Sequence, residues 1–214
     1  MNHELAARLK RQDPDRYFCA LLAPQAMRDA LLALYAFDCE LARARTVASQ
    51  PILAMIRLQW WREVVEGAVR RHEVATPLSE ALAAGLLDRG ECLRMIEGRE
   101  MELEEAVPDL DWFERYCLTA HGSVMAAAGG SADREALRRI GAGYGAVWVM
   151  KKRAEWVGFD GTEAAREWLV VPKGLRRSAV ALPAVLAARD LKHWGRPRLV
   201  WDQVAVVARA WCGT

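Results

Sequence analysis

Three segments of the sequence with helical periodicity carry charged side chains on faces that are otherwise apolar. The charged positions are Asp38 and Arg45 in segment 25–48, Glu100 in segment 91–107, and Lys151 and Glu155 in segment 134–157. A charge inside a protein is costly unless it is paired or lines a polar cavity. The pattern therefore predicts a central cavity with polar walls. Charged groups that reach solvent at the rim of the core would produce the same pattern.

His121, in the sequence TAHGS, is the residue best suited to acid–base chemistry. No Ser, Cys or Asp stands at a recognisable spacing from it, so we expect a hydrogen-bonded histidine in the core. The five cysteines form no CxxC pair and show no zinc-binding spacing, which predicts reduced, buried thiols. They are Cys19, Cys39, Cys92, Cys117 and Cys212.

Composition places the chain among ordinary globular proteins. It has 214 residues, of which 53% are hydrophobic and 27% charged, and we predict a single domain over residues 1–214. A net charge of +2 gives no reason to expect a nucleic-acid partner. The N-terminus lacks a continuous apolar segment, and no later run of 18 residues is free of charge.

These features predict a cytoplasmic protein that has no membrane span. The chain contains nine tryptophans, and an exposed tryptophan would suit a peripheral contact at the inner membrane. Burial of the tryptophans in a helical core is the alternative.

Helical periodicity dominates the chain, and no long stretch alternates as a strand would. The predicted helices cover 25–48, 52–69, 78–87, 91–107, 112–128 and 134–157. The pattern weakens after Gly161 and returns in two short segments, 182–194 and 200–211, which we expect to cap the bundle. Short connections containing Pro, Gly, Asp or Ser favour antiparallel neighbours, so the predicted fold class is all-α.

Five sequence blocks resemble the squalene/phytoene synthases, in the order in which that family carries them. They are DPDRYFCALLAPQAMRDALLALYAFDCELARA at 13–44, LQWWREVVEG at 58–67, MIEGREMEL at 95–103, YCLTAHGSVM at 116–125 and GAGYGAVWVMKK at 141–152. The resemblance implies an isoprenoid-synthase-like helical bundle around a central cavity. It also implies two facing helices with Asp-rich motifs that bind Mg²⁺, which holds a diphosphate and helps it leave.

The first Asp-rich motif departs from the family pattern. The register set by Tyr35–Phe37 places Ala42, Arg43 and Thr46 where the family has acids. Asp38 and Glu40 lie nearby in the sequence. They are two residues apart on a helix, which turns their carboxylates in nearly opposite directions, so they cannot chelate one ion.

The second Asp-rich motif departs as well. Lys151 and Lys152 stand where the resemblance implies Arg and Asp, and Glu155 and Trp156 stand at the final acidic pair. The sequence therefore predicts no catalytic residue, no metal ligand and no cofactor. Magnesium would be required only by an active transferase.

Some features of an anion-binding cavity remain. Arg16 stands where the family has a phosphate-contacting arginine, and Lys151 keeps a basic residue at its position. The alternatives are a surface arginine near a helix start and a lysine in a solvated last helical turn. The candidate binding residues are Arg16, Phe37, Asp38, Arg45, Trp61, Tyr116, Trp148, Lys151 and Glu155.

The sequences YAF, ELARAR and IRLQWWRE are similar to one branch of the family, which includes the mitochondrial assembly factor of respiratory complex I and its bacterial relatives. That resemblance implies a non-catalytic protein that binds a prenyl lipid, contacts a subunit of a respiratory complex during assembly, or does both. An active farnesyl or geranylgeranyl diphosphate transferase is an alternative. An isoprenoid carrier, with a prenyl diphosphate or lipid in the cavity, is another.

Overall fold

The structure is a computed structural model that describes residues 3–47, 50–103, 107–129, 133–176 and 178–194, and the single positions 196, 204 and 208. Regular structure in these ranges is helical, apart from an isolated bridge between Val107 and Val157. The all-α prediction is therefore confirmed. Every described helix is too short or too polar to cross a membrane.

The α-helices run in chain order from α1 to α11. Their bounds are α1 His3–Gln12, α2 Pro14–Leu21, α3 Gln25–Val47, α4 Pro51–Glu66, α5 Ala75–Ala83, α6 Arg89–Met101, α7 Leu110–Tyr116, α8 Ser123–Ala127, α9 Arg134–Lys152, α10 Thr162–Trp168 and α11 Leu182–Lys192. A π-helical segment, η1 (Cys117–Gly122), joins α7 to α8. Two 3₁₀ turns, η3 (Ala154–Trp156) and η4 (Lys173–Leu175), follow α9 and α10.

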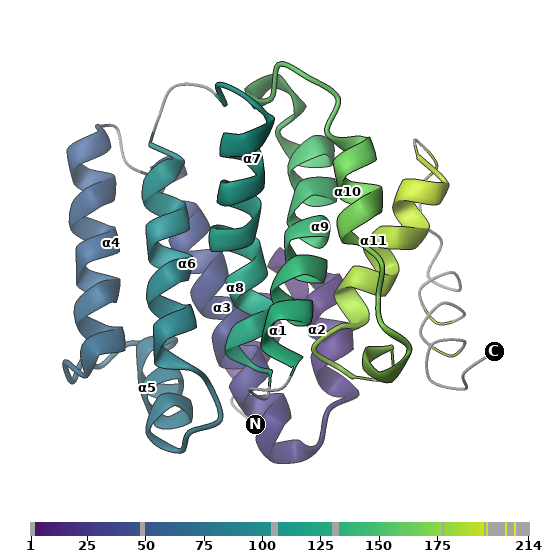
Figure 1. Ribbon diagram of the computed structural model, residues 1–214. Coiled ribbons are helices and arrows are strands. Elements are labelled where there is room, and N and C mark those ends of the chain that lie inside the picture. Colours follow the sequence, from purple (N-terminus) through teal and green to yellow (C-terminus); the bar gives the residue numbers. More distant parts are fainter. Residues whose placement is uncertain are drawn as a thin grey trace.

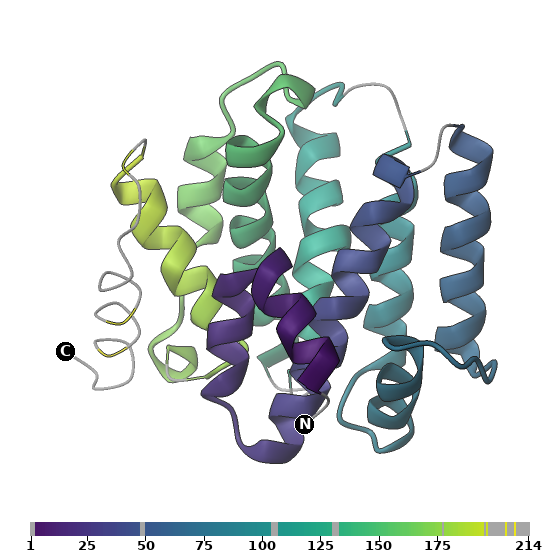
Figure 2. The ribbon, with the colours of Figure 1, turned by 180° about the vertical axis from the view of Figure 1, so that it is seen from behind.

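The long helices stand side by side as a bundle. In Figure 1, α4 lies at one edge, followed by α6, α7, α9 and α10, while α11 lies toward the opposite edge. Figure 2 shows α1, α2 and α3 across the other side of this row. Helix α9 packs against η1, α8, α10 and α11, and α3 packs against α1, α2, α4 and α5. Residues far apart in the sequence are thereby brought to the middle of the bundle.

Local sequence signals explain where several helices begin and end. The Asp13 carboxylate accepts a hydrogen bond from the backbone N–H of Arg16 at 2.9 Å and so caps α2. Asp88 and Asp109 cap α6 and α7 in the same way. Helix α4 starts at Pro51 and ends at Glu66, where it is capped by Gly67, whose φ of 119° favours glycine.

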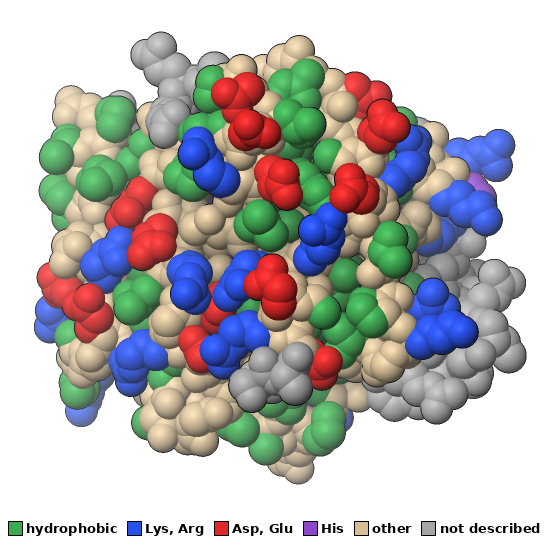
Figure 3. Space-filling model, viewed as in Figure 1, with side chains coloured by type: hydrophobic (Ala, Val, Ile, Leu, Met, Phe, Trp, Pro, Cys, Tyr) green, Lys and Arg blue, Asp and Glu red, His purple; other side chains and the backbone are tan. Residues whose placement is uncertain are grey.

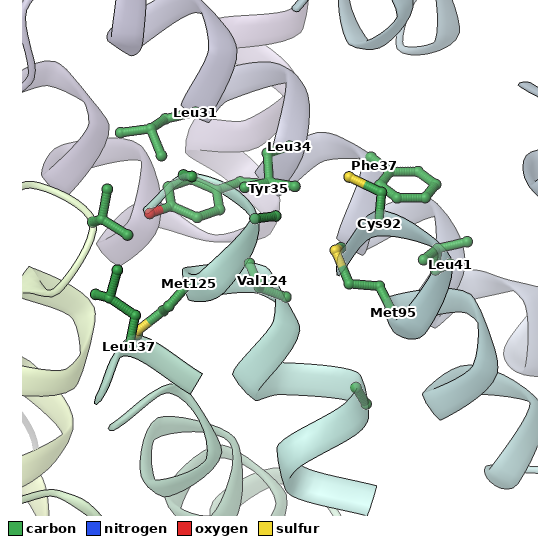
Figure 4. Close-up of a cluster of buried hydrophobic side chains, with 14 of the residues drawn as sticks. Leu31, Leu34, Tyr35, Phe37, Leu41, Cys92, Met95, Val124, Met125 and Leu137 are labelled. Carbon is green, nitrogen blue, oxygen red and sulfur yellow. The ribbon is translucent and has the colours of Figure 1, made fainter. Parts of the chain in front are cut away.

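The core joins α3 to α6, α8 and α9. Figure 4 shows buried side chains of these helices meeting across the bundle. The labelled ones are Leu31, Leu34, Tyr35, Phe37, Leu41, Cys92, Met95, Val124, Met125 and Leu137. Four free cysteines lie among the described residues, three of them buried, as expected for structural thiols. Cys212 lies outside the described residues.

The predicted long helices agree with α3, α4, α6 and α9 to within a few residues at most ends. The helix predicted at 112–128 corresponds to α7, η1 and α8, which follow one another without a break from Leu110 to Ala127. The π-helical turns of η1 were not predicted, because apolar periodicity does not reveal such turns. Helices α1, α2 and α10 were not predicted. They are short, so they carry too few turns for a clear periodic signal. The segment predicted at 200–211 lies almost entirely outside the described residues.

Two glycines let neighbouring helices approach η1 very closely. A Cβ added to Gly98 of α6 would lie within 3.0 Å of the backbone nitrogen of Ala120. One added to Gly145 of α9 would lie within 3.0 Å of the His121 ring. Side chains larger than hydrogen therefore cannot stand at these positions without moving η1.

We expect Gly98→Ala to lower the free energy of unfolding by about 1–3 kcal/mol, because the new methyl group meets rigid backbone instead of a movable side chain. Urea denaturation would measure the loss. Gly158→Ala is the matched control, since a Cβ at Gly158 meets nothing within 4 Å. Equal stability of the two variants would contradict the close packing of α6 on η1.

Candidate functional site

The carboxylate of Asp38 lies at the centre of the bundle and is held by two arginines. Asp38 is 2% exposed. Its Oδ1 accepts a hydrogen bond from Nη2 of Arg99 at 2.7 Å, and its Oδ2 accepts one from Nη1 of Arg16 at 2.7 Å. Burial by itself would raise the pKa of Asp38, but the guanidinium groups of Arg99 and Arg16 outweigh it and hold the pKa well below its usual range. Asp38 is therefore a buried carboxylate ion with both oxygens engaged.

Arg99 connects Asp38 to a second buried acid, Glu102, at the end of α6. Arg99 forms an ion pair with Oε1 of Glu102, and the Tyr116 hydroxyl donates to the same oxygen at 2.7 Å. Oε2 of Glu102 accepts from Arg153 at 3.0 Å. Burial would raise the pKa of Glu102, but Arg99 and Arg153 lower it. This acid is also held as an ion by internal cations.

Arg16 completes the cluster from the side of α2. Its Nε donates to Oδ2 of Asp13 at 2.5 Å, and its guanidinium carbon lies 5.2 Å from the centre of the Tyr35 ring and 5.8 Å from that of Tyr144. Arg16 is buried, so it is not a free surface arginine. We call the three arginines and three acids the central ion network: Arg16, Arg99, Arg153, Asp13, Asp38 and Glu102. Its formal charge is zero.

His121 contacts this network through Tyr116. The ring nitrogen Nε2 lies 3.2 Å from the Tyr116 hydroxyl oxygen. Since that hydroxyl gives its hydrogen to Glu102, the histidine contact is a hydrogen bond only if Nε2–H is the donor. Burial, together with the nearby charge of Arg99, lowers the pKa of His121 to about 3. This is the hydrogen-bonded core histidine expected from the sequence.

A cavity of about 230 Å³ adjoins the network and has both polar and aromatic walls. It lies among α2, α3, α6, η1 and α9. Its lining residues are Gln12, Asp13, Arg16, Asp38, Cys39, Ala42, Arg43, Arg99, His121, Tyr144 and Trp148. Polar groups from several helices therefore do converge on a central cavity.

A wider groove of about 750 Å³ lies beside the cavity, between the start of α2, α9 and α11. Gln12, Asp13, Tyr144 and Trp148 line both spaces, so the groove continues the cavity toward the surface. Its cations are Lys151, Lys152 and Arg196, and its apolar walls include Val147, Trp148, Met150, Ala187 and Trp194. Lys151 Nζ lies 2.6 Å from Oδ2 of Asp190. The acids of the groove are Asp13, Asp15 and Asp190, so it combines apolar walls with charges of both signs.

The structure brings some of the candidate residues together. Arg16 and Asp38 line the cavity, Trp148 lines both spaces and Lys151 lines the groove. Tyr116 is buried behind the cavity, where it donates to Glu102.

The other candidates line neither space. Phe37 and Trp61 pack on each other, with ring centres 5.2 Å apart. Both are buried core residues. Arg45 places its guanidinium carbon 5.6 Å from the centre of the Trp156 ring. Glu155 is exposed in η3, after α9 has ended. Candidate residues that were expected to face inward therefore do not all line the same cavity.

Arg99, which pairs with both Asp38 and Glu102, was not among the residues expected at the cavity. The sequence suggested Glu100 as the inward charge of this helix, but Glu100 is only partly buried and pairs with Arg62 at 2.8 Å. The buried stripe of α6 runs through Cys92, Met95 and Ile96, and the same helical spacing leads to Arg99. This i, i+3, i+4, i+7 spacing could have identified Arg99 as an inward-facing residue.

The residues at the centre do not fit a magnesium ion. Magnesium requires near-octahedral oxygen ligands, and the oxygens of Asp38 and Glu102 already accept from arginines or Tyr116. Ala42 and Arg43, at positions where the resemblance implies acids, line the cavity. Within the described ranges, no three acidic, His or Cys side chains are grouped to hold a metal. An added dication would face the positive charges of Arg16 and Arg99.

Comparison with known proteins identifies the family. Residues 9–148 match the squalene/phytoene synthase family. The chain belongs to this family. It is also similar to a solved dehydrosqualene synthase in complex with a ligand, with a TM-score of 0.84 and 12% identity over 99% of this chain and 95% of that one. The expected isoprenoid-synthase-like fold is confirmed.

Two curated relatives carry the same description, "NADH dehydrogenase (ubiquinone) complex I, assembly factor 6". The human protein is 26% identical over 129 residues, which are 58% of this chain and 39% of that protein. The rat protein is 30% identical over 122 residues, 55% and 37% of the two chains. The matched region thus spans less than half the length of these relatives.

We expect Asp38→Ala to lower the free energy of unfolding by about 3–5 kcal/mol, because Arg16 and Arg99 would lose the buried charge that neutralises them. Glu167→Gln is the control, since it removes an exposed ion pair with Arg139, whose contribution is at most about 1 kcal/mol. Urea denaturation compares the two. A loss below about 1 kcal/mol in Asp38→Ala would contradict a tightly coupled network.

The stability of the protein should depend on pH through His121. Below pH 6.5 the unfolded chain protonates this histidine, whereas the folded chain keeps it neutral down to a pKa of about 3. The free energy of unfolding therefore falls as the pH falls through this window, by up to about 1.4 kcal/mol per pH unit from this group. His121→Gln should have a shallower slope between pH 6.5 and 5 in urea denaturation. Parallel curves would show that His121 titrates alike in both states.

Proposed function

We propose that this chain is a non-catalytic member of the squalene/phytoene synthase family that assists the assembly of a respiratory NADH dehydrogenase complex. The central ion network is the observation that supports the first part of the proposal, that the protein is non-catalytic. Arginines from three parts of the chain neutralise the acids beside a cavity that Ala42 and Arg43 also line, and these two stand where the family resemblance implies metal-binding acids.

The electrostatics of the network argue against metal-dependent ionisation of a prenyl diphosphate. Departure of pyrophosphate builds up negative charge on the leaving group, and bound divalent cations stabilise that charge. To bind such a cation, Asp38 would have to release Arg99 or Arg16, leaving a buried guanidinium without its partner. The cost of that exchange supports a loss of metal-dependent catalysis.

The relatives support the second half of the proposal. The human and rat proteins are described as assembly factors of complex I, and their matched regions cover more than half of this chain. A folded helical bundle that does not perform metal-dependent catalysis can still act by binding another protein. We therefore infer that its partner is a subunit or an assembly intermediate of the NADH dehydrogenase complex.

A second role, binding of a prenyl lipid without turnover, is favoured by the groove between α9 and α11. Its walls of Trp148, Met150 and Trp194 suit an apolar chain, and Lys151 and Lys152 suit an anionic head group. A lipid bound in the groove would leave the rest of the surface available to a protein partner. Lipid binding and assistance in assembly are therefore compatible.

Incubation with farnesyl or geranylgeranyl diphosphate and Mg²⁺ should release no pyrophosphate above the level of a heat-inactivated sample, since the central acids are already neutralised. Pyrophosphate release and extraction of lipid products provide the two readouts. Magnesium-dependent turnover by folded protein would reject the non-catalytic proposal and favour an active transferase.

Assembly needs its own experiment. Deletion of the gene should reduce the amount of complete NADH dehydrogenase complex on native gels, and the wild-type chain should restore it. A variant that neutralises two of the three groove cations, Lys151→Gln with Lys152→Gln, tests whether restoration requires an anionic ligand. Normal amounts of the complex in the deletion strain would contradict a role in its assembly.

A further inference from the structure

Helix α4 exposes four large apolar side chains on adjacent turns. Ile52 and Ile56 are 60% and 59% exposed, and Leu53 and Met55 are each 43% exposed. We call these four residues the α4 ridge. The side chains that α4 buries are Ala54, Leu58, Trp61, Val64 and Val65. The first half of this helix is therefore apolar on both its inner and its outer face, which is unusual for a helix at a surface.

Nothing else in the described chain covers the ridge. Helix α4 stands at the edge of the bundle in both ribbon views. Figure 3 shows hydrophobic side chains gathered over the upper part of α4 at the left edge of the molecule. The ridge residues line neither the central cavity nor the groove. The ridge is thus a convex apolar surface that faces outward.

The charges that α4 itself carries along and just after the ridge are positive. Residues 50–62 contain Arg57 and Arg62 and no acidic residue. Arg62 pairs with Glu100. Arg57 is exposed and makes no hydrogen bond or ion pair within the part of the chain that the structure describes. It follows Ile56 directly, and its long aliphatic stem lets the guanidinium group reach a phosphate while the neighbouring apolar residues lie deeper.

The size and shape of the ridge argue against a second copy of the chain and against a small ligand as its partner. Four partly exposed side chains offer only a few hundred Å² of apolar surface, whereas a stable dimer buries about 800 Å² on each partner. A small ligand needs a concave site, which a ridge on an edge helix does not provide. A bilayer accepts a convex apolar ridge without needing a complementary shape. With 16 residues, α4 is too short to span a bilayer and would lie in its plane.

We propose that the α4 ridge docks the protein on a membrane surface that contains anionic phospholipids. Ile52, Leu53, Met55 and Ile56 enter the boundary between head groups and acyl chains, and Arg57 contacts lipid phosphates. This role is independent of whether the protein assists complex assembly. It requires only the exposed face of α4.

Flotation of the purified full-length chain with lipid vesicles tests the proposal. One set of vesicles contains phosphatidylcholine alone, and the other contains three parts phosphatidylcholine to one part phosphatidylglycerol. The wild type should float with the mixed vesicles. Ile52→Ser with Ile56→Ser should reduce binding by about tenfold or more, because less apolar surface enters the bilayer. Val170→Ser is the control, since it removes an apolar side chain that is 72% exposed elsewhere.

Arg57→Gln separates the electrostatic contribution to vesicle binding from the contribution of the apolar side chains. It should weaken binding to the mixed vesicles, and the difference from wild type should shrink as salt is raised. Circular dichroism checks that every variant is folded. Failure of the wild type to float, or equal flotation of the wild type and the double variant, would overturn the proposal. A concentration-dependent dimer that the double variant abolishes, without flotation, would assign the ridge to a second copy instead.

Discussion

An ionised carboxylate buried among helices is stable only when its charge is neutralised where it lies. Asp38 of α3 meets this condition with one arginine on each oxygen: Arg16 from α2 and Arg99 from α6. Three helices are thereby tied at one point. Because Arg99 also pairs with Glu102, and Glu102 accepts from Tyr116 and Arg153, the same constraint extends to α7 and to the end of α9. This chain of charges therefore links the helices that surround the cavity.

The network shows how an isoprenoid-synthase-like fold can keep its centre polar without metal ligands. Arg99 contacts acids from two places in the chain, a bridging contact of the kind that a cation makes between carboxylates. An arginine differs from a bound ion because it is covalently attached, always charged and directional in its hydrogen bonds. The cavity therefore keeps polar walls, while the oxygens of these acids are already engaged by arginines and Tyr116.

The proposed functions use different surfaces of the molecule. The groove between α9 and α11 continues the central cavity and carries Lys151 and Lys152 beside aromatic walls. The α4 ridge lies at the far edge of the row of helices and is convex, apolar and flanked by Arg57. A protein that handles a lipid or a membrane complex would benefit from both. The two can be tested separately because no residue belongs to both.

Periodicity and motif order in the sequence by themselves determined much about this protein. They located α3, α4, α6 and α9, the family, the inward position of Asp38 and the core histidine, because these features repeat over several turns or lie within long recognisable blocks. They missed α1, α2 and α10, which are too short for such a signal, and the π-helical turns of η1, which shift the register locally. Only the tertiary structure decided which charges meet. Arg99 rather than Glu100 reaches Asp38, and Phe37 turns to Trp61 instead of the cavity, because the rotation of each helix is set by packing against its neighbours, and a single sequence contains no direct record of those contacts.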